Sequence, residues 1–324
     1  MAENLHNDHL NIIDGIYVYD SGKYKVSEFS KLNFNCFDVN NSNDELDDRD
    51  PLNCIRSTMN LSIPNSKYLL EEEPMRTADS NSLEILNWNV RSIPTNFKVF
   101  DQMYDISADI ICLCETRLDK DIVDYRYFRN NYFAFHEPRD RNGGGVSLFI
   151  KEDLKPELVQ EQSYICPAFE IVSATFKVNN CVNFISSIYR PPDTDTELFL
   201  TKLEELLEFI RLKNYKNYYL AGDWNVNLLK HTDSLPKKLL DLTANYFGFP
   251  IITKPTRVKK QSATLIDNLW TDNIANILKS SILIDDITDH FPCLSLFNTK
   301  RIKNDYSSPQ SKKEITRRII LLTF

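Results

Sequence analysis

The chain has 324 residues, of which 42% are hydrophobic, and its formal net charge at pH 7 is −8. This length suits one large α/β domain with appendages or two ordinary domains, and the acidic balance disfavours a strongly basic nucleic-acid-binding protein. No apolar run approaches the roughly 20 residues that cross a bilayer, and the N-terminus lacks the basic-then-apolar order of a signal peptide, so we expect an intracellular protein without a membrane partner.

Three segments differ in composition. Residues 1–80 hold 15 acidic and 7 basic side chains, and their polar stretch DVNNSNDELDDRDPLN predicts an acidic, largely disordered N-terminal segment. Residues 81–299 carry regular apolar patterns and predict the folded domain. Residues 300–324 hold 7 basic and 2 acidic side chains and predict a basic tail.

The predicted elements of residues 81–299 mix strands with helices. The apolar run at 108–115 is typical of a strand covered on both faces, and Asn179–Asn180 predicts a hairpin turn. In chain order, we expect strands at 83–90, 108–115, 146–150, 169–178, 179–189, 218–226, 263–272 and 280–290, and helices at 97–106, 196–212 and 235–249. Hairpins together with helical crossovers favour an α/β fold in which two sheets pack face to face as a sandwich flanked by helices.

Polar side chains stand at the ends of the predicted strands. They are Asn89, Glu115, Tyr189, Asp223, Asn225, Asp267, Asp289 and His290. Any one of the carboxylates alone is an ordinary turn residue. Strand ends on one side of a sheet meet at a crevice, however, and carboxylates gathered there repel one another unless a cation or a proton joins them. Hard divalent cations prefer oxygen ligands, so the set predicts metal-assisted hydrolysis of a phosphate ester.

Six motifs in order carry a family resemblance. They are NWNVRS, ICLCETRL, SIYRPP, LAGDWNVNL, ATLIDNLW and TDHFP. In this order they resemble the endonuclease/exonuclease/phosphatase superfamily over about residues 83–299. The run TKPTRVKKQSATLIDNLWTD resembles more narrowly the endonuclease domain of non-LTR (LINE-type) retrotransposons. Trp224 stands where the family more often has Phe, and Thr288 stands where Ser is usual. Neither departure removes a catalytic group.

The resemblance implies a deoxyribonuclease-like fold of four layers, α/β/β/α, and a role for each matched residue. The implied catalytic residues are Asp223, Asn225, His290, Asp267 and Tyr189, the implied metal ligands are Glu115, Asn89 and Asp289, and the implied substrate contacts are Thr264, Arg190 and Arg257. The implied cofactor is Mg²⁺ or Mn²⁺. Whether Asp223 or His290 acts as the base stays open, as does the number of metal ions.

Several of these residues have a simpler interpretation. Asn89 could cap a strand end, Tyr189 could be a buried aromatic residue with a satisfied hydroxyl group, and Arg190 and Arg257 could be solvated.

The implied function is a Mg²⁺-dependent phosphodiester hydrolase that nicks DNA to leave a 3′ hydroxyl group. We expect a nuclear, monomeric protein whose partner is DNA. The resemblance also leads us to expect a reverse transcriptase domain, for which the 324 residues leave no room, so residues 300–324 are interpreted as a truncated link to it. Two alternatives stay open, because the same site occurs in different enzymes. One is an inactive mobile-element remnant acting at most as a binding module, and the other is a phosphatase of the same superfamily.

Overall fold

The structure is a computed structural model that describes residues 10–13, 16–19, 66–69, 81–97, 99, 108–119, 131–259 and 262–299. The predicted tail at 300–324, and all but two residues of the predicted helix at 97–106, lie outside these ranges. In the N-terminal segment, β1 (Leu10–Ile13) and β2 (Ile16–Tyr19) form an antiparallel pair. No helix among the described residues is long and apolar enough to cross a membrane.

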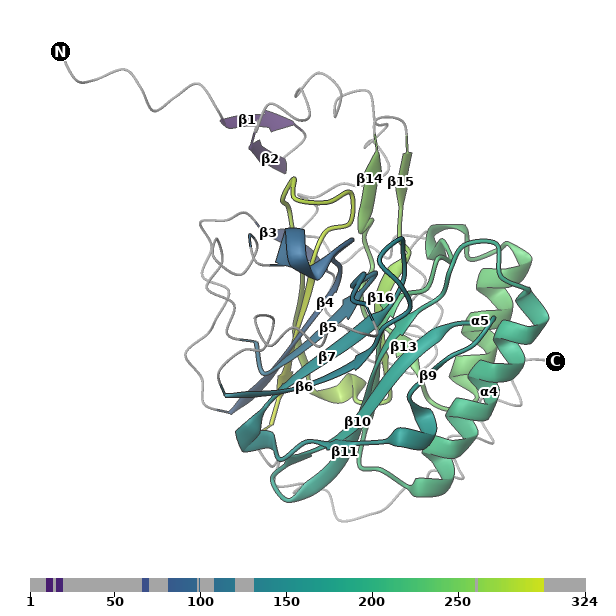
Figure 1. Cartoon of the computed structure of the whole chain (residues 1–324). Coiled ribbons are helices and arrows are strands. Elements are labelled where there is room, and N and C mark those ends of the chain that lie inside the picture. The colour runs from purple at the N-terminus through teal and green to yellow at the C-terminus, as the bar shows by residue number, and fades with distance from the viewer. Residues whose placement is uncertain are drawn as a thin grey trace.

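Two seven-stranded sheets organise the described chain (Figure 1). The first sheet has the order β3 (Lys67–Leu69), β17 (Ile277–Leu283), β18 (Cys293–Asn298), β4 (Ser82–Asn89), β5 (Ile110–Cys114), β7 (Val146–Lys151), β6 (Tyr132–Glu137). The second sheet has the order β13 (Phe249–Pro250), β16 (Asp267–Thr271), β12 (Tyr218–Asp223), β11 (Cys181–Tyr189), β10 (Glu170–Val178), β8 (Glu157–Leu158), and β9 (Tyr164–Ile165) also pairs with β10. Both sheets mix parallel and antiparallel pairs.

The sheets pack face to face around one large core, which confirms the predicted sandwich. Strand β5 illustrates the arrangement, because its side chains alternate between two apolar layers. Cys112 and Cys114 lie in the core between the sheets, whereas Ile111 and Leu113 lie in a second cluster on the outer face of the first sheet. The apolar run at 108–115 is therefore a strand buried on both faces, as predicted.

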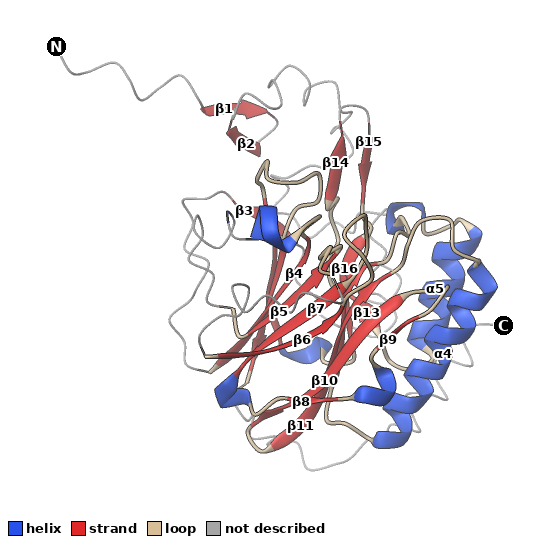
Figure 2. Cartoon of the chain, viewed as in Figure 1, coloured by secondary structure: helices blue, strands red, loops and turns tan. Residues whose placement is uncertain are grey.

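Helices α4 (Thr196–Lys213) and α5 (Ser234–Ala244) lie beside each other and cover the second sheet (Figure 2). Helix α4 buries one apolar stripe, made of Phe199, Leu203, Leu206, Leu207 and Ile210. Asp195 caps its N-terminus by accepting a hydrogen bond from the Leu198 amide at 2.7 Å. On the outer face of the first sheet, the short helical turn η2 (Ile93–Phe97) buries Ile93 and Phe97.

The hairpin predicted at Asn179–Asn180 is confirmed. Strands β10 and β11 pair antiparallel on either side of it, from Val178 opposite Cys181 to Glu170 opposite Tyr189. Both asparagines have positive φ, 52° and 63°, as the tight two-residue hairpin turn requires. The pairing carries Tyr189 to the same end of the sheet as Glu170.

Four predicted elements differ from the structure, and the first is the strand predicted at 218–226, which ends at Asp223. The helix predicted at 235–249 ends at Ala244, because Phe247 turns into the left-handed region (φ 60°) and the Gly248 amide returns to Thr243 O at 2.9 Å. The strand predicted at 263–272 is divided into β15 (Ser262–Thr264), which pairs only with β14 (Arg257–Lys259), and β16. The strand predicted at 280–290 ends at Leu283.

A further difference concerns the predicted boundary at residue 81. Strand β3 belongs to the segment expected to precede the domain, yet it pairs parallel with β17 at the edge of the first sheet. Ser66, just before it, is buried and exchanges hydrogen bonds with the backbone amide and hydroxyl of Thr253. The folded domain therefore draws at least one strand from before residue 81.

Candidate active site

The polar strand ends predicted from sequence meet at one end of the sandwich. In the second sheet, Asp223 ends β12, with Tyr189 of β11 on one side and Asp267 of β16 on the other. In the first sheet, Asn89 ends β4, and Glu115 directly follows β5. The twist and pairing of two sheets thus gather residues that lie up to 178 positions apart in the sequence.

Asn89 joins the two sheets through its side-chain amide. Its Nδ2 donates to Glu115 Oε1 at 2.8 Å and to Asp223 Oδ2 at 2.9 Å, and its Oδ1 accepts a hydrogen bond from the Arg91 amide at 3.2 Å. The side chain is fully satisfied although it is only 1% exposed. Asn89 therefore fixes the relative positions of the two carboxylates.

Glu115 sits on a strained turn after β5. Its φ of 50° is uncommon for a residue other than glycine, and such outliers gather at functional sites. Burial raises the pKa of the Glu115 carboxyl group, but the Asn89 hydrogen bond and the nearby Arg91 charge outweigh burial, so the net pKa is lowered. Glu115 is consequently held as a carboxylate.

Asp223 is almost completely buried, with 1% exposure. Besides Asn89, its carboxylate accepts the backbone amide of Asn225 at 3.0 Å. Burial raises the pKa of the Asp223 carboxyl group to about 7, and the charge of Asp267 acts in the same direction. Such a shift is typical of groups that exchange protons in a functional site.

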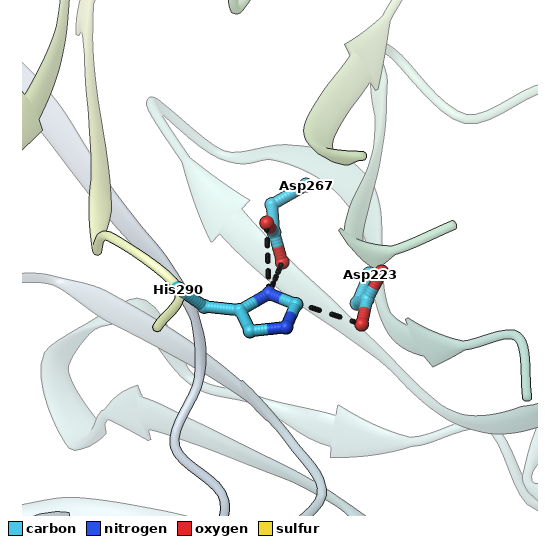
Figure 3. A group of neighbouring side chains, drawn as sticks. All are labelled: Asp223, Asp267 and His290. Carbon is cyan, nitrogen blue, oxygen red and sulfur yellow. Dashed lines mark hydrogen bonds and ion pairs between the residues drawn. The ribbon is translucent and has the colours of Figure 1, made fainter. Parts of the chain in front are cut away.

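Asp267 and His290 form a buried pair beside Asp223 (Figure 3). His290 Nδ1 lies 3.0 Å from both carboxylate oxygens of Asp267 and 4.0 Å from Asp223 Oδ2. Burial lowers the pKa of His290, but the Asp267 charge and hydrogen bond outweigh it and leave the pKa above its ordinary value. Because Asp267 occupies the Nδ1 side of the ring, it fixes the orientation of the imidazole.

The loop that carries His290 is held by its backbone. The carbonyl oxygen of His290 accepts the indole Nε1 of Trp88 at 2.9 Å, and its amide donates to Thr288 Oγ1 at 3.1 Å. The hydroxyl group at position 288, which the exchange of Ser for Thr preserves, thus has a structural partner. On its other side the loop forms an isolated antiparallel bridge between His290 and Arg257.

Asp289 lies between two guanidinium groups. Its Oδ1 is 2.8 Å from Arg91 Nε, and its Oδ2 is 2.9 Å from Arg257 Nε. Burial raises the pKa of Asp289, but the charge of His290 and the Arg257 hydrogen bond outweigh burial and lower it. The hydroxyl group of Thr264 donates to Arg257 O at 3.5 Å, and the two residues lie opposite each other at the base of the β14–β15 hairpin.

Tyr189 and Arg190 are both enclosed, so the interpretation of Arg190 as a solvated side chain is wrong. Tyr189 is 5% exposed, and burial followed by the charges of Glu115 and Asp223 raises the pKa of its hydroxyl group. Arg190 is 4% exposed, and its guanidinium donates to backbone carbonyl groups rather than lying on the surface. The described contacts therefore give Arg190 partners inside the protein, and its predicted contact with substrate is unsupported by them.

One hydroxyl group that sequence reasoning missed completes the Asp267–His290 pair. Thr256 is fully buried, and its Oγ1 donates to Asp267 Oδ2 at 2.7 Å while accepting the Asp267 amide at 3.1 Å. Thr256 thereby orients the Asp267 carboxylate, which in turn orients the imidazole of His290. Thr256 lies within the TKPTRVKKQ stretch, whose only sequence signal is its place shortly before ATLID.

The donor set fits a hard divalent cation. One ligand atom each from Asp223, Asp267 and His290 lie within 4.8 Å of one another. Asn89 Nδ2 bonds both Asp223 and Glu115, which brings the Glu115 carboxylate near this group. Carboxylate oxygens are the ligands that Mg²⁺ and Mn²⁺ prefer. Among the predicted metal ligands, Glu115 and Asn89 lie with this group, whereas the carboxylate of Asp289 faces Arg91 and Arg257.

A buried carboxylate cluster with an Asp-oriented imidazole, at one end of a two-sheet sandwich, defines a phosphoesterase-type site. The sequence model of the Endonuclease/Exonuclease/phosphatase family matches residues 86–290, which span the whole site, and the chain belongs to this family of hydrolases.

Two solved structures have a similar fold. The endonuclease domain of TRAS1, a telomere-specific non-LTR retrotransposon, has a TM-score of 0.53 at 14% identity, covering 68% of this chain and all of that one. The AP endonuclease LMAP from Leishmania major has a TM-score of 0.56 at 11% identity, covering 85% of this chain and 99% of that one. At these identities the likeness concerns the fold alone.

A curated relative is similar over a shorter stretch. DNA-(apurinic or apyrimidinic site) endonuclease 2 from Xenopus laevis is 33% identical over 85 residues, which is 24% of this chain. The match spans 16% of the length of that relative.

Proposed function

We propose that the protein is a divalent-metal-dependent phosphodiesterase that nicks DNA and leaves a 3′ hydroxyl group. The observation that carries the proposal is the convergence of Glu115, Asp223 and the Asp267–His290 pair, which Asn89 ties together across both sheets. Buried carboxylates at this spacing are stable when they share a cation, and a cation bound there supplies charge stabilisation for a phosphate undergoing hydrolysis.

The side chains divide into complementary roles in this proposal. Glu115 would hold the cation, with its carboxylate oriented by the Asn89 amide, and Asp223 and Asn225 orient the attacking water. His290, oriented by Asp267, faces the scissile phosphate, and Tyr189 donates its hydroxyl group to a phosphate oxygen. The pKa of Asp223 is raised to about 7, which suits it to move a proton near neutral pH, and the pKa of His290 is raised above its ordinary value by the charge of Asp267.

DNA is the proposed substrate because two kinds of relative point to it. The similar folds include a retrotransposon endonuclease domain and an AP endonuclease, and the curated relative also acts at apurinic or apyrimidinic sites according to its name. Arg91, Arg257 and Lys259 surround Asp289 at the rim of the site, where partly exposed cations suit contacts to phosphates. A nuclear location and an element that also encodes a reverse transcriptase belong to the same proposal.

A phosphatase is the second candidate, since the family name covers such enzymes and the donor set does not choose between phosphate diesters and monoesters. The test is a parallel assay with Mg²⁺, Mn²⁺ and EDTA on duplex DNA and on inositol phosphates. We expect metal-dependent cleavage of the duplex only, with product ends that a DNA polymerase extends. Turnover of inositol phosphates with no cleavage of DNA would support the phosphatase instead, and a folded protein that binds Mg²⁺ without turnover would support an inactive remnant.

A further inference from the structure

Arg190 is a charged side chain enclosed in the protein beside the candidate site. It directly follows Tyr189 at the end of β11 and is 4% exposed. Its Nη1 donates to Asn225 O at 3.3 Å, its Nη2 donates to Thr194 O at 3.1 Å, and its Nε has no hydrogen-bond partner among the described residues. Burying a charged group is unfavourable unless the group forms hydrogen bonds, so we ask which part of the site the Arg190 guanidinium holds.

Arg190 and Asn225 hold each other in both directions. The guanidinium of Arg190 donates to the backbone carbonyl of Asn225, and Asn225 Nδ2 donates to the backbone carbonyl of Arg190 at 2.8 Å. The amide of Arg190 also donates to Asp223 O at 2.9 Å. The turn after β12 is therefore tied to the turn after β11 by three hydrogen bonds.

The turn that Arg190 holds is left-handed at Asn225. The φ of Asn225 is 47°, in the left-handed region that asparagine adopts more readily than most residues other than glycine. The backbone carbonyl of Asn225 accepts a hydrogen bond from Arg190 Nη1. The guanidinium is thus bonded to the left-handed residue itself.

The hydrogen bonds of this turn decide which atom of the Asn225 side chain is left to accept a further hydrogen bond. Its Nδ2 is occupied by Arg190 O and by Asp223 Oδ2, at 2.8 and 3.3 Å. No group in the described part of the chain donates to its Oδ1. Asn225 therefore offers an acceptor beside the Asp223 carboxylate, which suits a water molecule held for attack.

Helix α4 supports the same turn from outside. The ring of Phe199 lies 4.9 Å from the guanidinium of Arg190, stacked below it, and packs edge-on against Trp224 at 6.4 Å. Trp224 separates Asp223 from Asn225 in the sequence and is buried. A planar guanidinium that reaches two carbonyl groups while stacking on a ring cannot be replaced by the single point charge of lysine.

We propose that Arg190 is a positioning residue that holds Asn225 in its left-handed turn, with the side-chain oxygen available as an acceptor beside Asp223, and that it does not contact DNA. The proposal deepens the function proposed above and rests on it for the role of Asn225.

The test compares Arg190→Lys, Arg190→Gln, Asn225→Ala and the double variant Arg190→Gln/Asn225→Ala in nicking of duplex DNA. Both Arg190 variants should lower kcat by about 10- to 100-fold, because each loses a charge-assisted bond to the turn. KM and its dependence on salt should change by less than about twofold, since no phosphate contact is lost. In the Asn225→Ala background, the Arg190→Gln substitution should lower kcat by less than about threefold, as expected of residues that act as a unit.

Two outcomes would overturn the proposal. A raised KM with a shallower salt dependence and an unchanged kcat would show that Arg190 contacts DNA. Fully multiplicative effects in the double variant would show that Arg190 acts without Asn225. Arg211→Gln is the matched control, because Arg211 is a surface arginine of α4 that pairs only with Glu208 among the described residues, and it should behave as the wild type.

A second measurement is independent of turnover. Backbone amides at 223–227 should exchange hydrogen faster in Arg190→Lys than in Arg211→Gln, because the turn has lost the hydrogen bond from the guanidinium of Arg190. Equal exchange in the two variants would contradict the proposal even if Arg190→Gln fails to fold. If the wild type cleaves no DNA, the function proposed above fails, while the exchange experiment still decides whether Arg190 holds the turn.

Discussion

Nδ1 of His290 lies 3.0 Å from each carboxylate oxygen of Asp267, and both side chains are only 1% exposed. The carboxylate is itself fixed by the hydroxyl group of Thr256 at 2.7 Å. The chain thus builds a buried hydroxyl–carboxylate–imidazole series that ends in the crevice next to Asp223.

The first prediction concerns this series. Asp267→Asn should lower kcat by about 100- to 10,000-fold, because the amide no longer fixes the protonated Nδ1 that orients His290 for proton transfer. His290→Ala should lower kcat by a similar factor, and the double variant should lower kcat little further than either single change. Single-turnover cleavage of a labelled duplex measures all three. Independent, multiplicative losses would show that the two side chains do not work as a pair.

The second prediction concerns the amide that joins the sheets. Asn89→Ala removes the group that bonds the Glu115 and Asp223 carboxylates at 2.8 and 2.9 Å. It should lower the free energy of unfolding by about 1–3 kcal/mol, because two buried carboxylates lose a shared donor. Urea unfolding with and without Mg²⁺ measures the effect. We expect Mg²⁺ to stabilise the wild type more than Glu115→Gln, and equal stabilisation would remove Glu115 from the metal site.

The third prediction concerns the close approach of β11 and β12. Gly222 pairs with Ile188 just before Asp223, and a Cβ atom at Gly222 would overlap the backbone carbonyl of Ile188. Gly222→Ala should therefore destabilise the fold by about 3 kcal/mol.

Gly143→Ala is its matched control, since the added Cβ would meet only the flexible end of Arg139 at 2.9 Å. It should change the stability by less than about 0.5 kcal/mol. Thermal or urea unfolding compares the two variants, and similar stability would mean that the strands can separate at Gly222.

The fourth prediction concerns pH and a histidine away from the site. His136 is half-buried on β6, with Nδ1 2.7 Å from Ser147 Oγ, and burial lowers its pKa from 6.5 to about 4. Between these values only the unfolded chain takes up the proton, so the free energy of unfolding should fall as pH falls from about 6.5 towards 4. The expected loss is about 1–3 kcal/mol.

Urea unfolding at a series of pH values measures this loss, and His136→Gln serves as the comparison. The variant should lack the part of the pH dependence that His136 contributes. An identical pH dependence in the two proteins would contradict a neutral, buried imidazole.

Much of the fold follows from short-range patterns. Windows of about ten to twenty residues predict the Asn179–Asn180 turn, the amphipathic helix α4 and the doubly buried strand β5. Such windows are sufficient because turn conformation, helical period and strand burial are local properties. Trp224 is buried between Asp223 and Asn225, although β12 ends at Asp223 and Asn225 turns into the left-handed region (φ 47°).

The misses depend on contacts between distant residues. The sequence at 263–272 looks like one continuous strand, but a loop divides it into β15 and β16. Strand β16 therefore begins at Asp267, opposite Asp223. Strand β3 joins the first sheet from within a polar segment because β17 offers it an edge. The hydrogen bond from Thr256 to Asp267 and the enclosure of Arg190 against Phe199 likewise depend on residues that the local sequence does not indicate.

The most direct test of the proposed phosphodiesterase is the nicking of supercoiled plasmid by the wild type and by Asp223→Asn in the same Mg²⁺ buffer. Asp223→Asn keeps the size of the side chain and removes the carboxylate that lies among Asn89, Asn225 and His290. We predict nicking by the wild type that EDTA abolishes, and a rate lower by about three orders of magnitude in the folded variant. Equal nicking by the two proteins, or none by a folded wild type, would contradict the account.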